Sequence, residues 1–111
     1  MKEIKAYIRK DRIDTVIGNL EEAGVKGMTV IDVNVLADWA DKNSYSYSIQ
    51  YVQKYSAIVK IELICEENEV GKLVNVIAKF GHTGKSGDGW VFVSNVEKSI
   101  RIKTGEINVI K

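Results

Sequence analysis

A chain of 111 residues, 45% hydrophobic and 28% charged, fits one globular domain that has room for a core but would gain from oligomerisation. A formal net charge of +1 gives no electrostatic reason to expect nucleic acid or an anionic membrane as partner, and the sequence predicts neither a membrane span nor a signal peptide. A single cysteine, Cys65, excludes an internal disulfide and fits a reducing cytoplasm, while a single histidine, His82, leaves too few ligands for a zinc site.

The first third of the chain predicts a strand, a helix and a second strand. Apolar and polar residues alternate over 4–9, as in a half-buried strand. Asp11 is the expected cap of a helix over 13–23, where apolar residues recur at helical spacing until Gly24 ends the run. The β-branched run over 28–36 then predicts the second strand.

Residues 37–55 interrupt this pattern with a polar segment rich in serine and tyrosine. A loop of this length inside a compact domain is usually functional or disordered. Because tyrosine is enriched at interfaces, the segment is either a docking surface for a partner or a loop that packs on its own oligomer.

The remainder of the chain repeats the strand–helix–strand order. The elements are expected over 56–65 (strand), 70–81 (helix), 90–96 (strand) and 99–103 (a short extended piece). Either Glu66 or Asn68 can cap the helix. The βαββαβ order predicts an α+β fold, the ferredoxin-like sandwich, with both helices on one face of a four-stranded sheet.

The other face of that sheet needs a cover that the chain itself does not provide. Isoleucine and valine occupy both sides of the third predicted strand, Ile58 and Ile64 on one side and Val59 and Ile61 on the other. We therefore expect the helix-free face to be buried against further copies of the chain.

Residues 83–89, Thr-Gly-Lys-Ser-Gly-Asp-Gly, are the most informative segment for function. Glycines let backbone N–H groups turn inward and form a nest for an anion, and a lysine adds charge, so the loop is suited to phosphate. The Walker A spacing is absent. Gly-Asp-Gly is also a common tight turn that binds nothing, and this second interpretation stays open on local grounds.

Five segments resemble the PII signal-transduction family, and the resemblance runs without gaps through nearly the whole chain. They are residues 1–9 (MKEIKAYIR), 24–30 (GVKGMTV), 59–62 (VKIE), 83–93 (TGKSGDGWVFV) and 100–106 (IRIKTGE). The resemblance implies one domain over 1–111 that assembles as a homotrimer. It also implies a regulator that binds ATP or ADP in clefts between subunits, with nitrogen regulation as one candidate role. In such a protein residues 37–55 would be the T-loop that docks onto a target transporter or enzyme, 82–89 the glycine-rich B-loop and 104–111 the C-terminal tail.

The resemblance also assigns site residues. Thr29 matches a residue on the adenine side of the nucleotide, Gly87, Asp88 and Gly89 match the loop around the ribose and phosphates, and Arg101 matches a phosphate-binding arginine. Lys103 stands in place of a second arginine and keeps its charge without the bidentate fork. The residues expected near the same cleft are Ile8, Ile64, Gly84, Lys85 and Trp90. No catalytic or metal-binding residue is implied.

The sequence departs from the family at the expected effector site. Trp90 replaces a cation, and Asp38 and Trp39 stand where the family has a basic residue and a glutamine that helps to hold Mg²⁺ and 2-oxoglutarate. We therefore expect no binding of 2-oxoglutarate with Mg²⁺, and either AMP or ADP in preference to ATP or a different small molecule. Tyr51 lies near a tyrosine that is modified in some members, but an ordinary exposed tyrosine is expected.

Two other classes of function are alternatives to a regulator. A slow nucleotide hydrolase would need an acid–base pair or a nucleophile, and Asp88 with Glu106 does not make one. A structural trimer with a vestigial cleft would bind no ligand. The basic residues around the first strand, Lys5, Arg9, Lys10 and Arg12, indicate a solvated surface, with phosphate binding as the alternative.

Overall fold

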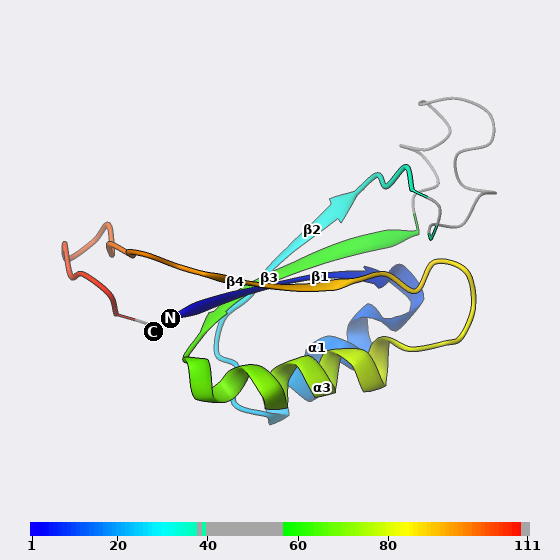
Figure 1. Ribbon diagram of the computed structural model, residues 1–111, viewed down its shortest axis with the longest axis horizontal. Coiled ribbons are helices and arrows are strands. Elements are labelled where there is room, and N and C mark those ends of the chain that lie inside the picture. Colours follow the sequence, from blue (N-terminus) through cyan, green and yellow to red (C-terminus); the bar gives the residue numbers. More distant parts are fainter. Residues whose placement is uncertain (38, 40–56, 110–111) are drawn as a thin grey trace.

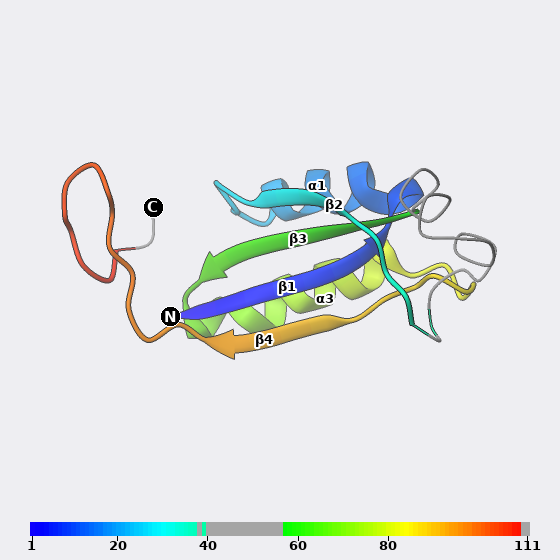
Figure 2. The ribbon, with the colours of Figure 1, turned by 90° about the horizontal axis from the view of Figure 1, so that it is seen from above.

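Four strands and two helices follow one another in the order β-α-β-β-α-β in a computed structural model that describes residues 1–37, 39 and 57–109. The elements are β1 (Lys2–Arg9), α1 (Ile13–Glu22), β2 (Thr29–Val33), β3 (Ile58–Cys65), α3 (Val70–Gly81) and β4 (Val91–Asn95), with 3-10 turns η1 (Lys10–Arg12) and η3 (Glu67–Glu69) before the helices. The strand order is β2-β3-β1-β4, and every neighbouring pair is antiparallel. Figure 2 shows both helices on one side of this sheet, which confirms the predicted ferredoxin-like α+β fold.

The strand register brings the apolar positions of three strands onto one face. Ile4 of β1 lies opposite Leu63 of β3 and Val93 of β4, and Ala6 lies opposite Ile61. Residues that face each other directly across a sheet point to the same side. This side therefore presents one apolar surface to the helices, as the alternation in the sequence predicts.

The helices close the core over that surface (Figure 1). Val16 and Leu20 of α1 and Leu73 and Ile77 of α3 are at most 2% exposed and belong to one cluster with the strand residues. Burying a side chain of this size contributes about 1.5–3 kcal/mol relative to leaving it in water. The helical spacing of apolar residues thus accounts for which face of each helix packs inward.

Several predicted boundaries are corrected by the structure. The first helix is preceded by η1 and makes no side-chain cap, so the prediction that Asp11 caps it is wrong. Glu66, not Asn68, caps the turn before α3 in a capping box, in which its N–H donates to Glu69 Oε1 at 3.2 Å. The second strand ends at Val33, and 99–103 is no strand, because a turn over 102–104 separates Ile100 from its bridge partner Ile107.

The helix-free face of the sheet carries apolar side chains between charged ones. Ile64 is 38% exposed and Phe92 52%, whereas Ile58 is almost fully buried. Lys5 pairs with Glu3, and Lys60 pairs with Glu62, each at 3.5 Å along its own strand. The prediction of apolar residues on both sides of β3 is confirmed, and the burial of this face by other copies stays a prediction.

Candidate functional site

The glycine loop, residues 82–89, connects the C-terminal end of α3 to β4 and lies beside the end of β1 (Figure 1, yellow). His82, the first residue of the loop, is the C-cap of α3, which ends at Gly81. The loop re-enters the sheet at Trp90, whose carbonyl accepts the Tyr7 N–H at 2.9 Å. The loop is therefore fixed at both ends by regular structure.

The carboxylate of Asp88 organises the interior of the glycine loop. It accepts hydrogen bonds from the Thr83 and Gly84 N–H groups at 2.9 and 2.8 Å and from Thr83 Oγ1 at 2.6 Å. Partial burial disfavours its charged form, but the bonds from Thr83 and Gly84 outweigh that effect and hold the pKa of Asp88 below its usual value of 3.8. The loop thus holds its own anion on the N–H groups that the sequence suggested for phosphate.

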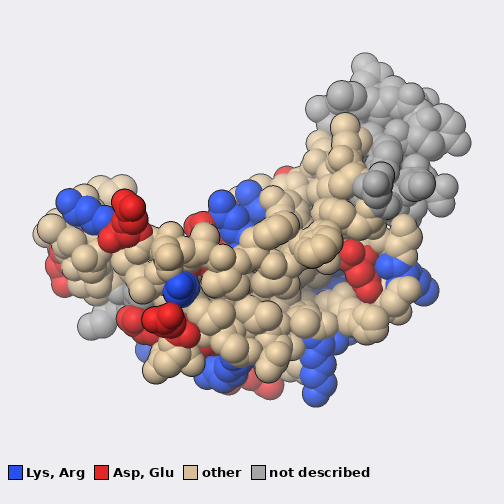
Figure 3. All heavy atoms as spheres, viewed as in Figure 1, with Lys and Arg blue, Asp and Glu red and all other residues tan. Residues whose placement is uncertain are grey.

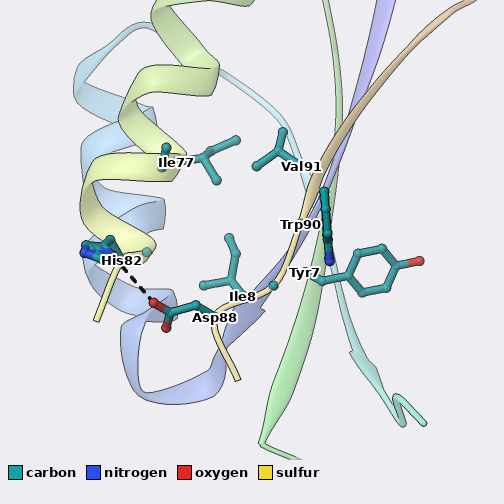
Figure 4. Close-up of a pocket in the computed structure, with 10 residues that line it drawn as sticks. Tyr7, Ile8, Ile77, His82, Asp88, Trp90 and Val91 are labelled. Atoms are coloured by element: carbon teal, nitrogen blue, oxygen red, sulfur yellow. Dashed lines mark ion pairs between the residues drawn. The ribbon is translucent and has the colours of Figure 1, made fainter. Parts of the chain in front are cut away.

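His82 lies beside the same carboxylate. Figure 4 shows the imidazole beside Asp88, with Nδ1 3.5 Å from Oδ2. The side chain of His82 is 68% exposed while that of Asp88 is 26% exposed. The imidazole is therefore available to solvent, and the carboxylate is held by the loop.

Replacing Asp88 by asparagine is expected to lower the free energy of unfolding by about 1–3 kcal/mol near neutral pH, because three donors lose a charged acceptor. A carboxyl whose pKa is lower when folded stabilises the protein above its unfolded pKa, here 3.8, and that contribution disappears as pH falls through the folded value. Thermal unfolding of both proteins from pH 6 to pH 2.5 measures this. The two curves should converge in acid, and a gap that is independent of pH would contradict the assignment.

Two contacts that the sequence does not reveal hold the outer side of the loop. The Arg9 guanidinium donates to the Ser86 carbonyl at 2.6 Å and pairs with Asp11 at 3.0 Å. The Gly87 N–H donates to the Trp39 carbonyl at 2.8 Å. The side chain of Arg9 is only 18% exposed, so the interpretation of this residue as part of a solvated surface is wrong.

Gly87 has to be glycine for this arrangement. Its φ is +104°, and a Cβ there would lie 2.9 Å from Arg9 Nη1. Residues with a side chain rarely adopt this backbone conformation, and the Arg9 guanidinium already fills the space that a side chain would need. The buried Gly87 thus allows both the Arg9 contact and the bond to Trp39.

A small cavity of about 210 Å³ lies between α3 and the start of β4. Figure 4 shows Ile8, Ile77 and Val91 directed into it, with Asp88 and His82 at its mouth. Four predicted site residues line it: Ile8, Asp88, Gly89 and Trp90. The remaining lining residues are Tyr7, Ile77, Ala78, Gly81, His82 and Val91. The walls are therefore mostly apolar.

Aromatic rings gather on the helix-free face next to the loop. Trp90 stacks on Phe92 with ring centroids 6.2 Å apart, and Tyr7 contacts Phe92 and Trp39 edge-on at 6.1 and 6.2 Å. We call these four residues the aromatic cluster. Trp90 is 56% exposed. A neutral ring surface thus borders the glycine loop.

The other predicted site residues lie elsewhere on the subunit. Ile64 pairs with Glu3 near the beginning of β1, and Thr29 starts β2, the edge strand opposite β4. Arg101 and Lys103 belong to the segment after β4, which projects beyond the end of the sheet at which β1 begins (Figure 1, orange to red). One subunit therefore separates Thr29, Ile64, Arg101 and Lys103 from the glycine loop.

Some predicted residues lie outside the part of the chain that the structure describes. Asp38, Tyr51 and nearly all of 37–55 lie outside the described residues. Within 1–37, 39 and 57–109, no three His, Cys, Asp or Glu side chains gather as a metal site. No helix in this part of the chain is long and apolar enough to cross a bilayer.

The sheet, the two helices and the structured glycine loop define a class, the ferredoxin-like domains with a candidate binding loop between the second helix and the last strand. Comparison with known proteins narrows this class. Residues 1–106 match the family described as "Nitrogen regulatory protein P-II". Proteins of that name from Azospirillum brasilense and Microchaete diplosiphon are 36% and 35% identical over 106 and 108 residues, which cover 96% and 97% of this chain and 95% and 96% of theirs. One from Pasteurella multocida is 34% identical over 108 residues, 97% of this chain and 96% of its own.

The chain belongs to the nitrogen regulatory protein P-II family. The resemblance that the five sequence segments carry is thereby confirmed. Members are named as regulatory proteins and not as enzymes, and the chain is a regulator of the PII type.

Proposed function

We propose that this regulator works as a homotrimer in the cytoplasm, binds an adenine nucleotide (ATP, ADP or AMP) in clefts between subunits, and controls a target transporter or enzyme through residues 37–55. The observation that carries the proposal is the separation of the predicted site residues. The glycine loop lies at one end of the sheet, and Arg101 and Lys103 lie past the other. A second copy is the simplest way to bring the two groups together.

The surface of the subunit supports the same assembly. Ile100, Ile102 and Ile107 of the C-terminal segment are 57%, 100% and 56% exposed in the single chain. Exposed apolar side chains that cluster on one projecting segment commonly mark an interface. The partly exposed Ile64 and Phe92 add to the apolar surface on the helix-free face.

Titration calorimetry with ATP, ADP and AMP tests the nucleotide. We expect at least one to bind, and Arg101→Ala to weaken it about tenfold to a hundredfold, because a hydrogen bond to a charged group contributes about 1.5–3 kcal/mol. Among the described residues the guanidinium of Arg101 makes no hydrogen bond or ion pair, so its loss leaves the subunit fold intact. Gly87→Val should also abolish binding, but it strains the loop itself.

Two controls sharpen this experiment. Lys72→Ala removes an exposed cation from α3, away from both groups of predicted site residues, and should leave the affinity unchanged. Adding 2-oxoglutarate with Mg²⁺ should not increase nucleotide affinity, because Asp38 and Trp39 replace the family's groups for it. If none of the three nucleotides binds, the adenine form of the proposal is overturned.

The second candidate is a PII-type trimer that senses a different small molecule. The composition of the cavity favours it, because the lining contains the carboxylate of Asp88 but no lysine or arginine. This candidate predicts that Arg101→Ala has no effect on adenine nucleotides, because none of them binds to the wild-type protein.

A further inference from the structure

We propose that Trp90 sets the specificity of the glycine-loop site, so that it takes a nucleotide with a single phosphate group in preference to a triphosphate. The inference rests on the proposed nucleotide function and names the ligand class of that same site. It depends on three features of the glycine loop: the charges around it, its hydrogen-bond donors, which are already occupied, and the aromatic cluster beside it.

The first feature is charge. The lining of the cavity includes Asp88, whose pKa is held low so that the carboxylate is ionised near neutral pH. Arg9 faces the loop but pairs with Asp11 at 3.0 Å, so that its charge is largely offset. Lys85 is the exposed cation of the loop itself. The loop and its surroundings therefore carry little net positive charge.

The charge that another copy would add is also limited. Arg101 and Lys103 would bring two cations, which together with Lys85 outnumber the Asp88 carboxylate by two. A phosphate monoester carries about −1.5 to −2 charges near neutral pH, so it matches this excess. A triphosphate carries more negative charge than the site can offset.

The second feature is the state of the backbone donors. The N–H groups of Thr83 and Gly84 are bonded to Asp88, and that of Lys85 is bonded to Thr83 Oγ1 at 3.1 Å. The Gly87 N–H is bonded to the Trp39 carbonyl. A chain of three phosphates would have to break several of these bonds, whereas a single phosphate needs fewer donors.

The third feature is the aromatic cluster. Trp90 borders the cavity as a residue, and its half-exposed indole lies on the helix-free face, where it stacks on Phe92 with an interplanar angle of 17°. Figure 3, which looks onto the β4 edge, shows mostly uncharged surface across the middle of this side. A flat neutral ring gains from contact with a base or sugar and gives no attraction to a second or third phosphate. Trp90 thus favours binding of the base or sugar and adds nothing to the binding of further phosphates.

The test compares AMP and ATP by titration calorimetry on the full chain. For the wild-type protein we expect AMP to bind at least tenfold more tightly than ATP. Trp90→Lys places a cation beside the loop and should shift the AMP-to-ATP affinity ratio at least tenfold towards ATP. Because Trp90 is half-exposed, the substituted chain should fold, and the affinity ratio within one protein does not depend on the fraction that is folded.

Asn75→Lys is the matched control, because it adds the same charge to an exposed position of α3, on the helix side of the sheet, that does not line the cavity. It should leave the ratio within about twofold of wild type. Equal affinity of wild type for AMP and ATP, or a ratio that Trp90→Lys leaves unchanged, would overturn the inference while the nucleotide function stands. Absence of binding for both nucleotides would overturn the nucleotide function and this inference with it.

Discussion

Replacing Gly89 by alanine is expected to lower the free energy of unfolding by about 3 kcal/mol, near the upper end of what overpacking costs. A Cβ at this position would lie 2.1 Å from the Tyr7 carbonyl oxygen and 2.9 Å from Tyr7 Cβ. The obstacle includes backbone, which cannot rotate away as a side-chain end can. The adjacent bond from the Tyr7 N–H to the Trp90 carbonyl would lengthen or break, and with it the start of the β1–β4 pairing.

Chemical denaturation of the two proteins measures this change. Gly18→Ala is the matched control, because Gly18 lies inside α1 and a Cβ there meets nothing within 4 Å. The same substitution at Gly18 should raise stability by about 0.5–1 kcal/mol, since alanine is the better helix former. Equal effects at the two positions would show that the close approach of Gly89 to Tyr7 does not constrain the fold.

The elements of the fold could be predicted from periodicity because the core uses it consistently. Leu20 and Ile77 recur at helical spacing, while Ile4 and Ile61 alternate with polar neighbours, and all four are buried. Boundaries were less predictable where contacts outside the element decide them. Strand β2 stops at Val33 because its pairing with β3 begins at Ile58, although the β-branched run continues.

The misassigned helix cap has a similar physical cause. Asp11 has a capping side chain at the right distance before the first helix, but its carboxylate bonds the Arg9 guanidinium. Those bonds outweigh burial and lower the pKa of Asp11. The chain passes through η1 instead, and α1 begins at Ile13 without a side-chain cap. A competing charge pair of this kind leaves no periodic signal in the sequence.

The candidate site was predictable only in part. The glycine loop and Asp88 stand out as a motif, but the role of Asp88 as the loop's own anion requires the folded geometry. The contact of Arg9 with Ser86 joins residues that are 77 positions apart, and the Trp39 contact uses a backbone carbonyl that any residue would provide. Neither contact could be derived from spacing or residue type.

The projecting C-terminal segment permits a direct test of assembly. Ile102 is 100% exposed in the single chain, so Ile102→Asp should change the stability of an isolated subunit by less than about 0.5 kcal/mol. If this segment packs on another copy, the same substitution buries an unpaired carboxylate at each interface, which costs about 3 kcal/mol or more. Sedimentation should then report a trimer for the wild-type protein and dissociation for Ile102→Asp at the same concentration.

The control for this experiment is Lys72→Asp, an exposed position on α3 on the helix side of the sheet, which should remain a trimer. A wild-type monomer would remove the explanation for the exposed apolar residues of the segment and leave Arg101 far from the glycine loop. A trimer that Ile102→Asp does not perturb would instead place the contacts on the helix-free face alone. Loss of nucleotide binding together with dissociation would tie the site to the interface, because each subunit by itself keeps the two groups of site residues apart.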